Sequence, residues 1–269
     1  MKAFSWCFAI VLLGVMSAST YADVDCSSVT NPPTVFFVNG MRADSDSVEE
    51  TKEGLRGVYL SHLDSLPNQS YVTDEMRCVS FRVAHNQNEE TWNELLEVFL
   101  QSVPDDTVAF WQWIDLIPGV TVPEWFRNAQ LALEETIVSA FAYIVDEDLQ
   151  QHIDQYAGTL GKRMVIAHSQ GNFYTTQANV LLPPDLRIPV FAVATPEGTS
   201  PSLGYLTHDD DYVINTARLV TGALPANAAG ECDEESDWSC HGMKESYLRT
   251  NGDYIAQHIL DTFFPPVLY

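Results

Sequence analysis

A serine stands at an abrupt turn within residues 164–182, which read MVIAHSQGNFYTTQANVLL. An apolar run typical of a buried strand, 164–167, precedes Ser169, and a helix-like segment, 171–181, follows it. A serine hydroxyl becomes an effective nucleophile only when a base takes its proton and N–H donors hold the oxyanion. A strand-to-helix turn exposes the hydroxyl at the sheet edge and points a helix N-terminus at the developing charge. Ser169, between the small residues Ala167 and Gly171, is therefore our candidate nucleophile.

Two simpler interpretations apply to the same turn. Ser169 could cap the N-terminus of the following helix, which would explain the helix but not the two small neighbours. His168 directly precedes the serine, but a tight turn places it on the opposite side of the chain. We therefore interpret His168 as a packing or hydrogen-bonding neighbour rather than the base.

The segment AHSQG resembles the nucleophile elbow of the α/β-hydrolase family, within its lipase and esterase branch, with Ala167 where the motif has glycine. The resemblance covers most of the chain in the order of its elements, and short motifs carry it. It implies an oxyanion hole formed by the backbone N–H groups of Gln170 and of Met41. Met41 lies in the turn NGMR after the first strand, where Asn39 replaces the histidine common in relatives.

The family order is serine, then Asp or Glu, then histidine. Downstream of Ser169 the segment THDDDYVI contains three adjacent carboxylates, 209–211. In similar lipases an apolar pair follows the acid, which favours Asp211, with Asp209 as the alternative. The other carboxylates are interpreted as solvated turn charges, with a calcium site as a minor alternative.

Two histidines follow Asp211 in the sequence. His258 stands in a helical segment beside two aliphatic residues, so we interpret it as structural. His241 lies in the loop SCHGMKESYL, next to a cysteine that could stiffen it, and is our candidate base. The remaining candidates, His62, His85 and His152, precede the serine and fall outside the family order.

The surrounding pattern alternates strands and helices. The expected strands are 34–38, 76–84, 164–167, 188–194 and a short one before the turn at 207–211. The expected helices are 47–63, 89–100, 146–160, 171–181 and 254–264. The first of these helices is expected to start at a capping box. This order predicts an α/β fold, specifically an α/β-hydrolase fold with a mostly parallel sheet and helices on both faces. About ten residues follow Ala194 before the next strand, which is short for a helical crossover, so either a tight loop connects them or one strand assignment is wrong.

An aromatic-rich segment, about 104–145, interrupts this pattern. It contains Trp111, Trp113, Trp125 and Phe126, with prolines between them. It could be an insertion that forms a cap or lid over a site, or ordinary core with a buried helix hairpin.

The first 22 residues have the features of a signal peptide, with Lys2, an apolar run and a Thr-Tyr-Ala cleavage site ending at Ala22. We expect a single domain, 23–269, that is secreted or periplasmic. Four cysteines remain in it, and in an oxidising compartment they predict two disulfides, Cys26–Cys78 and Cys232–Cys240, although free packed thiols are the alternative.

The chain is strongly acidic, with a formal net charge of −24 at pH 7. Such a surface repels nucleic acid and anionic lipid, and we expect no stable membrane insertion. No His-rich metal-ligand spacing occurs, and RADSDSVEE departs from the calcium-loop pattern, so we expect neither a metal nor a cofactor.

The resemblance implies a serine hydrolase that cleaves carboxylic esters through Ser169, His241 and Asp211 by way of an acyl-enzyme. The expected substrate is a small-molecule or lipid ester, and the sequence does not reveal a partner protein. The alternatives are a thioesterase or amidase with the same triad, and a binding protein on the same scaffold without turnover.

Overall fold

The computed structural model describes residues 24–40, 45–84, 146–231, 237 and 239–265. Several predictions lie outside these ranges: the signal peptide, Met41, His85, the helix 89–100, the aromatic segment 104–145 and Cys232.

A parallel sheet forms the centre of the described structure. Its strands are β1 (Thr34–Val38), β2 (Ser80–Ala84), β3 (Arg163–His168), β4 (Val190–Val193) and β5 (Tyr205–Leu206). They pair in the order β2-β1-β3-β4-β5, and each described pair is parallel. The predicted α/β class with a parallel sheet is thus confirmed.

Both faces of the sheet are buried, which explains the continuous apolar strands in the sequence. In β1, Val35 and Phe37 belong to one hydrophobic cluster, whereas Phe36 and Val38 belong to another on the opposite face. The alternation follows from the two-residue period of a strand.

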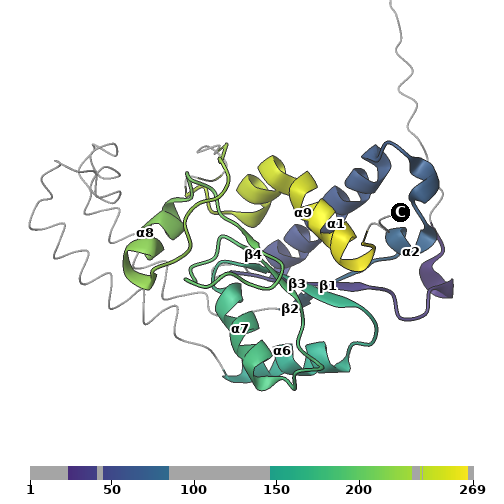
Figure 1. Ribbon diagram of the computed structural model, residues 1–269, viewed down its shortest axis with the longest axis horizontal. Helices are drawn as coiled ribbons and strands as arrows, with labels where there is room; N and C mark the ends of the chain where they lie inside the picture. The colour runs from purple at the N-terminus through teal and green to yellow at the C-terminus, as the bar shows by residue number, and fades with distance from the viewer. Residues whose placement is uncertain (1–23, 41–44, 85–145, 232–236, 238, 266–269) are drawn as a thin grey trace, which may run out of the picture.

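Helices cover the two faces separately (Figure 1). On one side α1 (Ser45–Ser65) packs against α9 (Arg249–Phe263), and on the other α6 (Asp146–Gly158) packs against α7 (Gly171–Leu181). Shorter elements complete the described fold: η1 (Cys26–Ser28), η2 (Gln69–Tyr71), α2 (Asp74–Arg77), α8 (Tyr212–Thr221) and the π-helix η3 (Met243–Leu248). Among the described helices, none combines the length and apolar composition that crossing a membrane requires.

Three helix boundaries differ from the predicted ones. Helix α1 begins at Ser45, so Ser47 is not its cap; the Ser47 carbonyl instead accepts a hydrogen bond from Thr51 Oγ1 at 2.9 Å. Helix α6 ends at Gly158, and α9 begins five residues earlier than expected, directly after the π-helix.

The predicted strand 76–84 was wrong in its first part. The Thr73 side chain accepts a hydrogen bond from the Met76 N–H, which caps the short helix α2, and the strand begins only at Ser80. Between them Cys78 forms a disulfide with Cys26, which confirms one of the two predicted bridges.

The connection from β4 to β5 is a tight loop. Residues 194–204 contain no helix, yet β4 and β5 pair in parallel. The outer edge of β5 is covered by the Asn227 amide, which donates to the Tyr205 carbonyl (2.7 Å) and accepts from the Thr207 N–H (2.8 Å). The predicted strand 188–194 is shorter than expected, and the helix α8 was not predicted.

Candidate active site

The candidate nucleophile lies where β3 ends and α7 begins. Ser169 follows the last residue of the strand and adopts a left-handed backbone conformation, with φ of 54°. Gln170, not Ser169, occupies the N-cap position of α7, so the interpretation of Ser169 as a helix cap was wrong. Left-handed conformations are costly for residues other than glycine and cluster at functional sites.

Close backbone contacts around Ser169 explain why small residues stand there. A Cβ added to Gly171 would lie 2.6 Å from the Val38 carbonyl oxygen, so the start of α7 packs directly on the end of β1. A Cβ added to Gly40 would lie 2.6 Å from Ser169 Cβ. Sequence reasoning selected Gly171 and places Gly40 in the tight turn after the first strand, but it does not bring Gly40 against Ser169.

The three predicted catalytic side chains come together in space. His241 Nε2 lies 2.8 Å from Ser169 Oγ, and His241 Nδ1 lies 2.9 Å from Asp211 Oδ2 and 3.1 Å from Asp211 Oδ1. Asp211 is fully buried and Ser169 nearly so, whereas 15% of the His241 side chain is exposed. With Nδ1 donating to the carboxylate, neutral His241 presents Nε2 as an acceptor for the serine hydroxyl proton.

Asp211 is positioned by the helix that it starts. It is the N-cap of α8, and its Oδ1 accepts a hydrogen bond from the Ile214 N–H at 2.9 Å. The alternative acid, Asp209, accepts from the Gly230 N–H through its own Oδ1 at 2.9 Å. Of these two carboxylates, the one that contacts His241 is therefore Asp211.

The loop that carries His241 is held by Asp237. Its carboxylate accepts hydrogen bonds from the Ser239 hydroxyl (2.7 Å), the Gly242 N–H (2.5 Å) and the Ser246 hydroxyl (2.7 Å). Burial alone would raise the pKa of Asp237, but these hydrogen bonds and the nearby His241 hold it below its usual 3.8. Cys240 is disulfide-bonded as predicted for it, while its expected partner, Cys232, lies outside the described residues.

His168 also contacts the loop that carries His241. Its Nε2 donates to the His241 carbonyl oxygen at 2.8 Å, and the two imidazole rings lie 4.8 Å apart. Burial, and then the proximity of His241, lowers the pKa of His168 to about 3. A neutral His168 hydrogen-bonds the backbone of the candidate base, in line with its interpretation as a neighbour.

Three of the other described histidines make contacts with groups other than Ser169. His62 contacts Gln257 (2.9 Å) and so joins α1 to α9, while His258 stacks on Phe191 with ring centroids 4.4 Å apart. His152 is fully buried and lies 5.4 Å from the ring of Tyr174.

The expected oxyanion donors are only partly described. Gln170 is buried at the start of α7, next to Ser169, where a helix N-terminus favours negative charge. Met41 lies outside the described residues, but the chain before it is ordered by Asn39, whose side-chain amide donates to the Gly40 carbonyl at 2.7 Å. Asn39 thus shapes the turn that leads to Met41.

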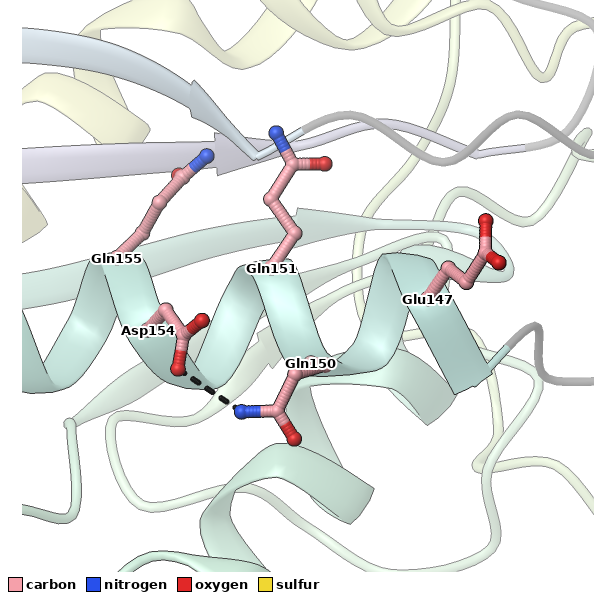
Figure 2. Close-up of a pocket in the computed structure, with 5 residues that line it drawn as sticks. All are labelled: Glu147, Gln150, Gln151, Asp154 and Gln155. Atoms are coloured by element: carbon pink, nitrogen blue, oxygen red, sulfur yellow. Dashed lines mark hydrogen bonds between the residues drawn. The ribbon is translucent and has the colours of Figure 1, made fainter.

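A surface hollow beside α6 contains none of these groups. Its described lining consists of polar side chains from one helix, among which Gln150 donates to Asp154 (Figure 2): Glu147, Gln150, Gln151, Asp154 and Gln155. None of these described lining residues is a serine or a histidine. In the described ranges, no group of three His, Cys, Asp or Glu residues is arranged to hold a metal ion.

No protein-family model and no curated protein matches the chain.

Proposed function

We propose that this protein is a serine hydrolase of the α/β-hydrolase type that cleaves carboxylic esters by acyl transfer. The observation that carries the proposal is the contact chain from Ser169 Oγ to His241 Nε2 (2.8 Å) and from His241 Nδ1 to Asp211 (2.9 Å). Its members come from the end of β3, a disulfide-bonded loop and the cap of α8, so no single element requires them to meet.

Each residue has a defined part in the proposed reaction. Ser169 Oγ attacks the ester carbonyl while His241 takes its proton, and the oxyanion is held by the N–H groups of Gln170 and Met41. His241 returns the proton to the leaving alcohol, and Asp211 stabilises the imidazolium. Water then repeats the sequence on the acyl-enzyme, again with His241 as the base, and releases the acid.

The left-handed conformation at Ser169 supports this proposal over a binding protein without turnover. A serine that only packs or caps a helix has no need of φ near 54°, which costs an ordinary residue about 1–2 kcal/mol. Strain of this kind persists where the surrounding structure imposes a functional geometry.

Export from the cytoplasm is proposed together with this activity. The Cys26–Cys78 disulfide supports it, because disulfides persist in oxidising compartments. Cleavage after Ala22 would leave Cys26 close to the new N-terminus.

A fluorophosphonate probe tests the proposal directly, because it phosphonylates serines that a neighbouring base activates. We expect stoichiometric labelling of Ser169, found by peptide mass spectrometry, and hydrolysis of p-nitrophenyl esters screened from two to sixteen carbons. Ser169→Ala should abolish both, whereas Ser70→Ala, at a surface serine, should change neither. A folded wild-type chain that resists the probe and hydrolyses no ester would overturn the proposal in favour of the binding protein.

A further inference from the structure

A tyrosine hydroxyl contacts the carboxylate of the candidate acid. The Tyr247 hydroxyl donates to Asp211 Oδ2 at 2.7 Å, and both side chains are fully buried. Sequence reasoning did not select Tyr247, since it lies six residues after His241 in what read as an ordinary loop.

The phenol ring is held in place by His208. The two rings are stacked, with centroids 4.0 Å apart and planes inclined by 18°. The backbone N–H of His208 also donates to the Tyr247 hydroxyl oxygen at 3.1 Å. His208 Nε2 in turn donates to Asn251 Oδ1 at 2.5 Å. Asp211, Tyr247, His208 and Asn251 thus form one continuous network that includes the candidate acid.

The backbone departs from regular helix where it supplies this network. Tyr247 belongs to the π-helix η3, and Asn251 has a non-helical conformation (φ −122°, ψ 22°) near the start of α9. π-helical turns are rare and occur frequently at functional sites. The irregular backbone therefore occurs at Tyr247 and Asn251, the two residues that this segment contributes to the network.

The hydrogen bond matters because Asp211 is a carboxylate removed from water. Its donors are His241 Nδ1, the Ile214 N–H and the Tyr247 hydroxyl, and a buried charge is tolerated only with such partners. Burial, and then the charge of Asp211, raises the pKa of Tyr247 well above its usual range, so the phenol keeps its proton and remains a donor.

We propose that Tyr247 is a positioning residue for the reaction: it fixes the Asp211 carboxylate and moderates the negative charge that this carboxylate presents to His241. The inference rests on the proposed function and assigns a role that the three catalytic side chains do not provide.

Loss of this donor has a predictable sign. A carboxylate with one hydrogen bond fewer stabilises the protonated form of His241 more strongly, so neutral, active His241 persists only at higher pH. Other titratable groups also surround the pair and stay unchanged in the test: His168, His208, Asp210 and Asp237.

The test compares Tyr247→Phe with Tyr59→Phe. Tyr59 is a matched control, because it is also fully buried and its hydroxyl donates to a protein acceptor, the Met76 carbonyl (2.9 Å), away from the site. We expect Tyr247→Phe to lower kcat by about tenfold to a hundredfold, as loss of a hydrogen bond to a charged group implies, with KM nearly unchanged. The acidic limb of its pH profile should move to higher pH, whereas Tyr59→Phe should keep the wild-type profile.

A second measurement separates this inference from the proposed function. The imidazole titration of His241, followed by NMR, should also move to higher pH in Tyr247→Phe, whether or not the chain hydrolyses esters. If the wild type hydrolyses no ester but the variant shows this shift, the proposed function would be overturned while the effect of Tyr247 on His241 would stand. An active wild type whose Tyr247→Phe variant retains kcat, pH profile and titration would overturn the positioning role alone. If Tyr247→Phe does not fold, Asn251→Ala should show the same shift in weaker form, and an unchanged titration there would contradict the inference.

Discussion

The two ends of the parallel sheet contain the same kind of turn but build it from different residues. At the amino end, positive φ angles occur at Asn31 before β1, Gly161 before β3 and Gly204 before β5. Asparagine and glycine adopt this conformation at low cost. At the carboxyl end and in the loop that meets it, positive φ angles occur at residues for which this conformation costs more than for glycine or asparagine: Ser169, Ala194 and Cys240.

This difference indicates that the surrounding structure imposes the turn conformation at the carboxyl end, whereas the local sequence favours it at the amino end. Ser169 is the candidate nucleophile, and Cys240 directly precedes the candidate base. The described carboxyl end therefore combines strain with buried polar contacts, whereas the described amino end combines relaxed turns with the Cys26–Cys78 bridge. We expect changes at the first end to affect chemistry and changes at the second to affect stability.

The largest expected effect comes from the carboxyl end. Asp211→Asn should lower kcat by about 10⁴-fold, because the amide no longer holds His241 in the tautomer that accepts the serine proton. Steady-state ester hydrolysis, with circular dichroism to confirm folding, measures the change. Asp209→Asn is the matched control and should keep near wild-type turnover; the reverse result would make Asp209 the acid.

An intermediate effect is expected at the amino end. A Cβ at Gly161, where φ is 89°, would lie 2.8 Å from the Asn31 carbonyl oxygen. Gly161→Ala should therefore lower the free energy of unfolding by about 1–3 kcal/mol, measured by urea denaturation, without changing kcat of the folded protein.

The corresponding test at the carboxyl end compares two substitutions of Ser169. Ser169→Ala retains the strain and Ser169→Gly relieves it, so the glycine variant should be the more stable by up to about 1 kcal/mol, although both are inactive. Equal stability of the two variants would show that the turn at Ser169 is not strained.

A further expected effect is an acid sensitivity that arises at the carboxyl end. The pKa of His168 falls from 6.5 in the unfolded chain to about 3 in the folded one, so between these values the unfolded state binds more protons. Stability is then complete above about pH 6.5 and declines as the pH falls, by at most about 1.4 kcal/mol per unit. His168→Gln keeps a donor for the His241 carbonyl but cannot titrate.

Denaturation of both proteins at pH 7 and pH 5 checks this prediction. His168→Gln should lose less stability than the wild type over that interval. An equal loss would assign the acid sensitivity to other groups.

Much of the site was predictable because its signals are local. The apolar strand before Ser169 and the small residues around it define the turn, and the predicted serine, acid and base are the residues that meet. The acid and base were chosen by family order, and geometry then distinguishes Asp211 from Asp209 by a contact that spans 30 residues.

What could not be predicted depends on contacts between distant segments. The α8 helix has a capping aspartate as its start signal, but we read Asp211 only as the acid, and the helix was missed. Tyr247 reaches Asp211 through a π-helix, and no sequence pattern that we considered indicates one. Gly40 touches Ser169 across 129 positions in the chain only because β1 and β3 are neighbours in the sheet.

The short edge strand β5 has a consequence for self-association. An open strand edge presents unpaired backbone groups on which a second chain can add a strand and begin a fibril. Here the Asn227 side-chain amide binds the Tyr205 carbonyl and the Thr207 N–H, the backbone groups with which an added strand would pair. The backbone N–H groups of Asn227 and Ala228 also donate to the Thr207 carbonyl. This short segment thus takes the place of a further strand and protects the edge against templated aggregation.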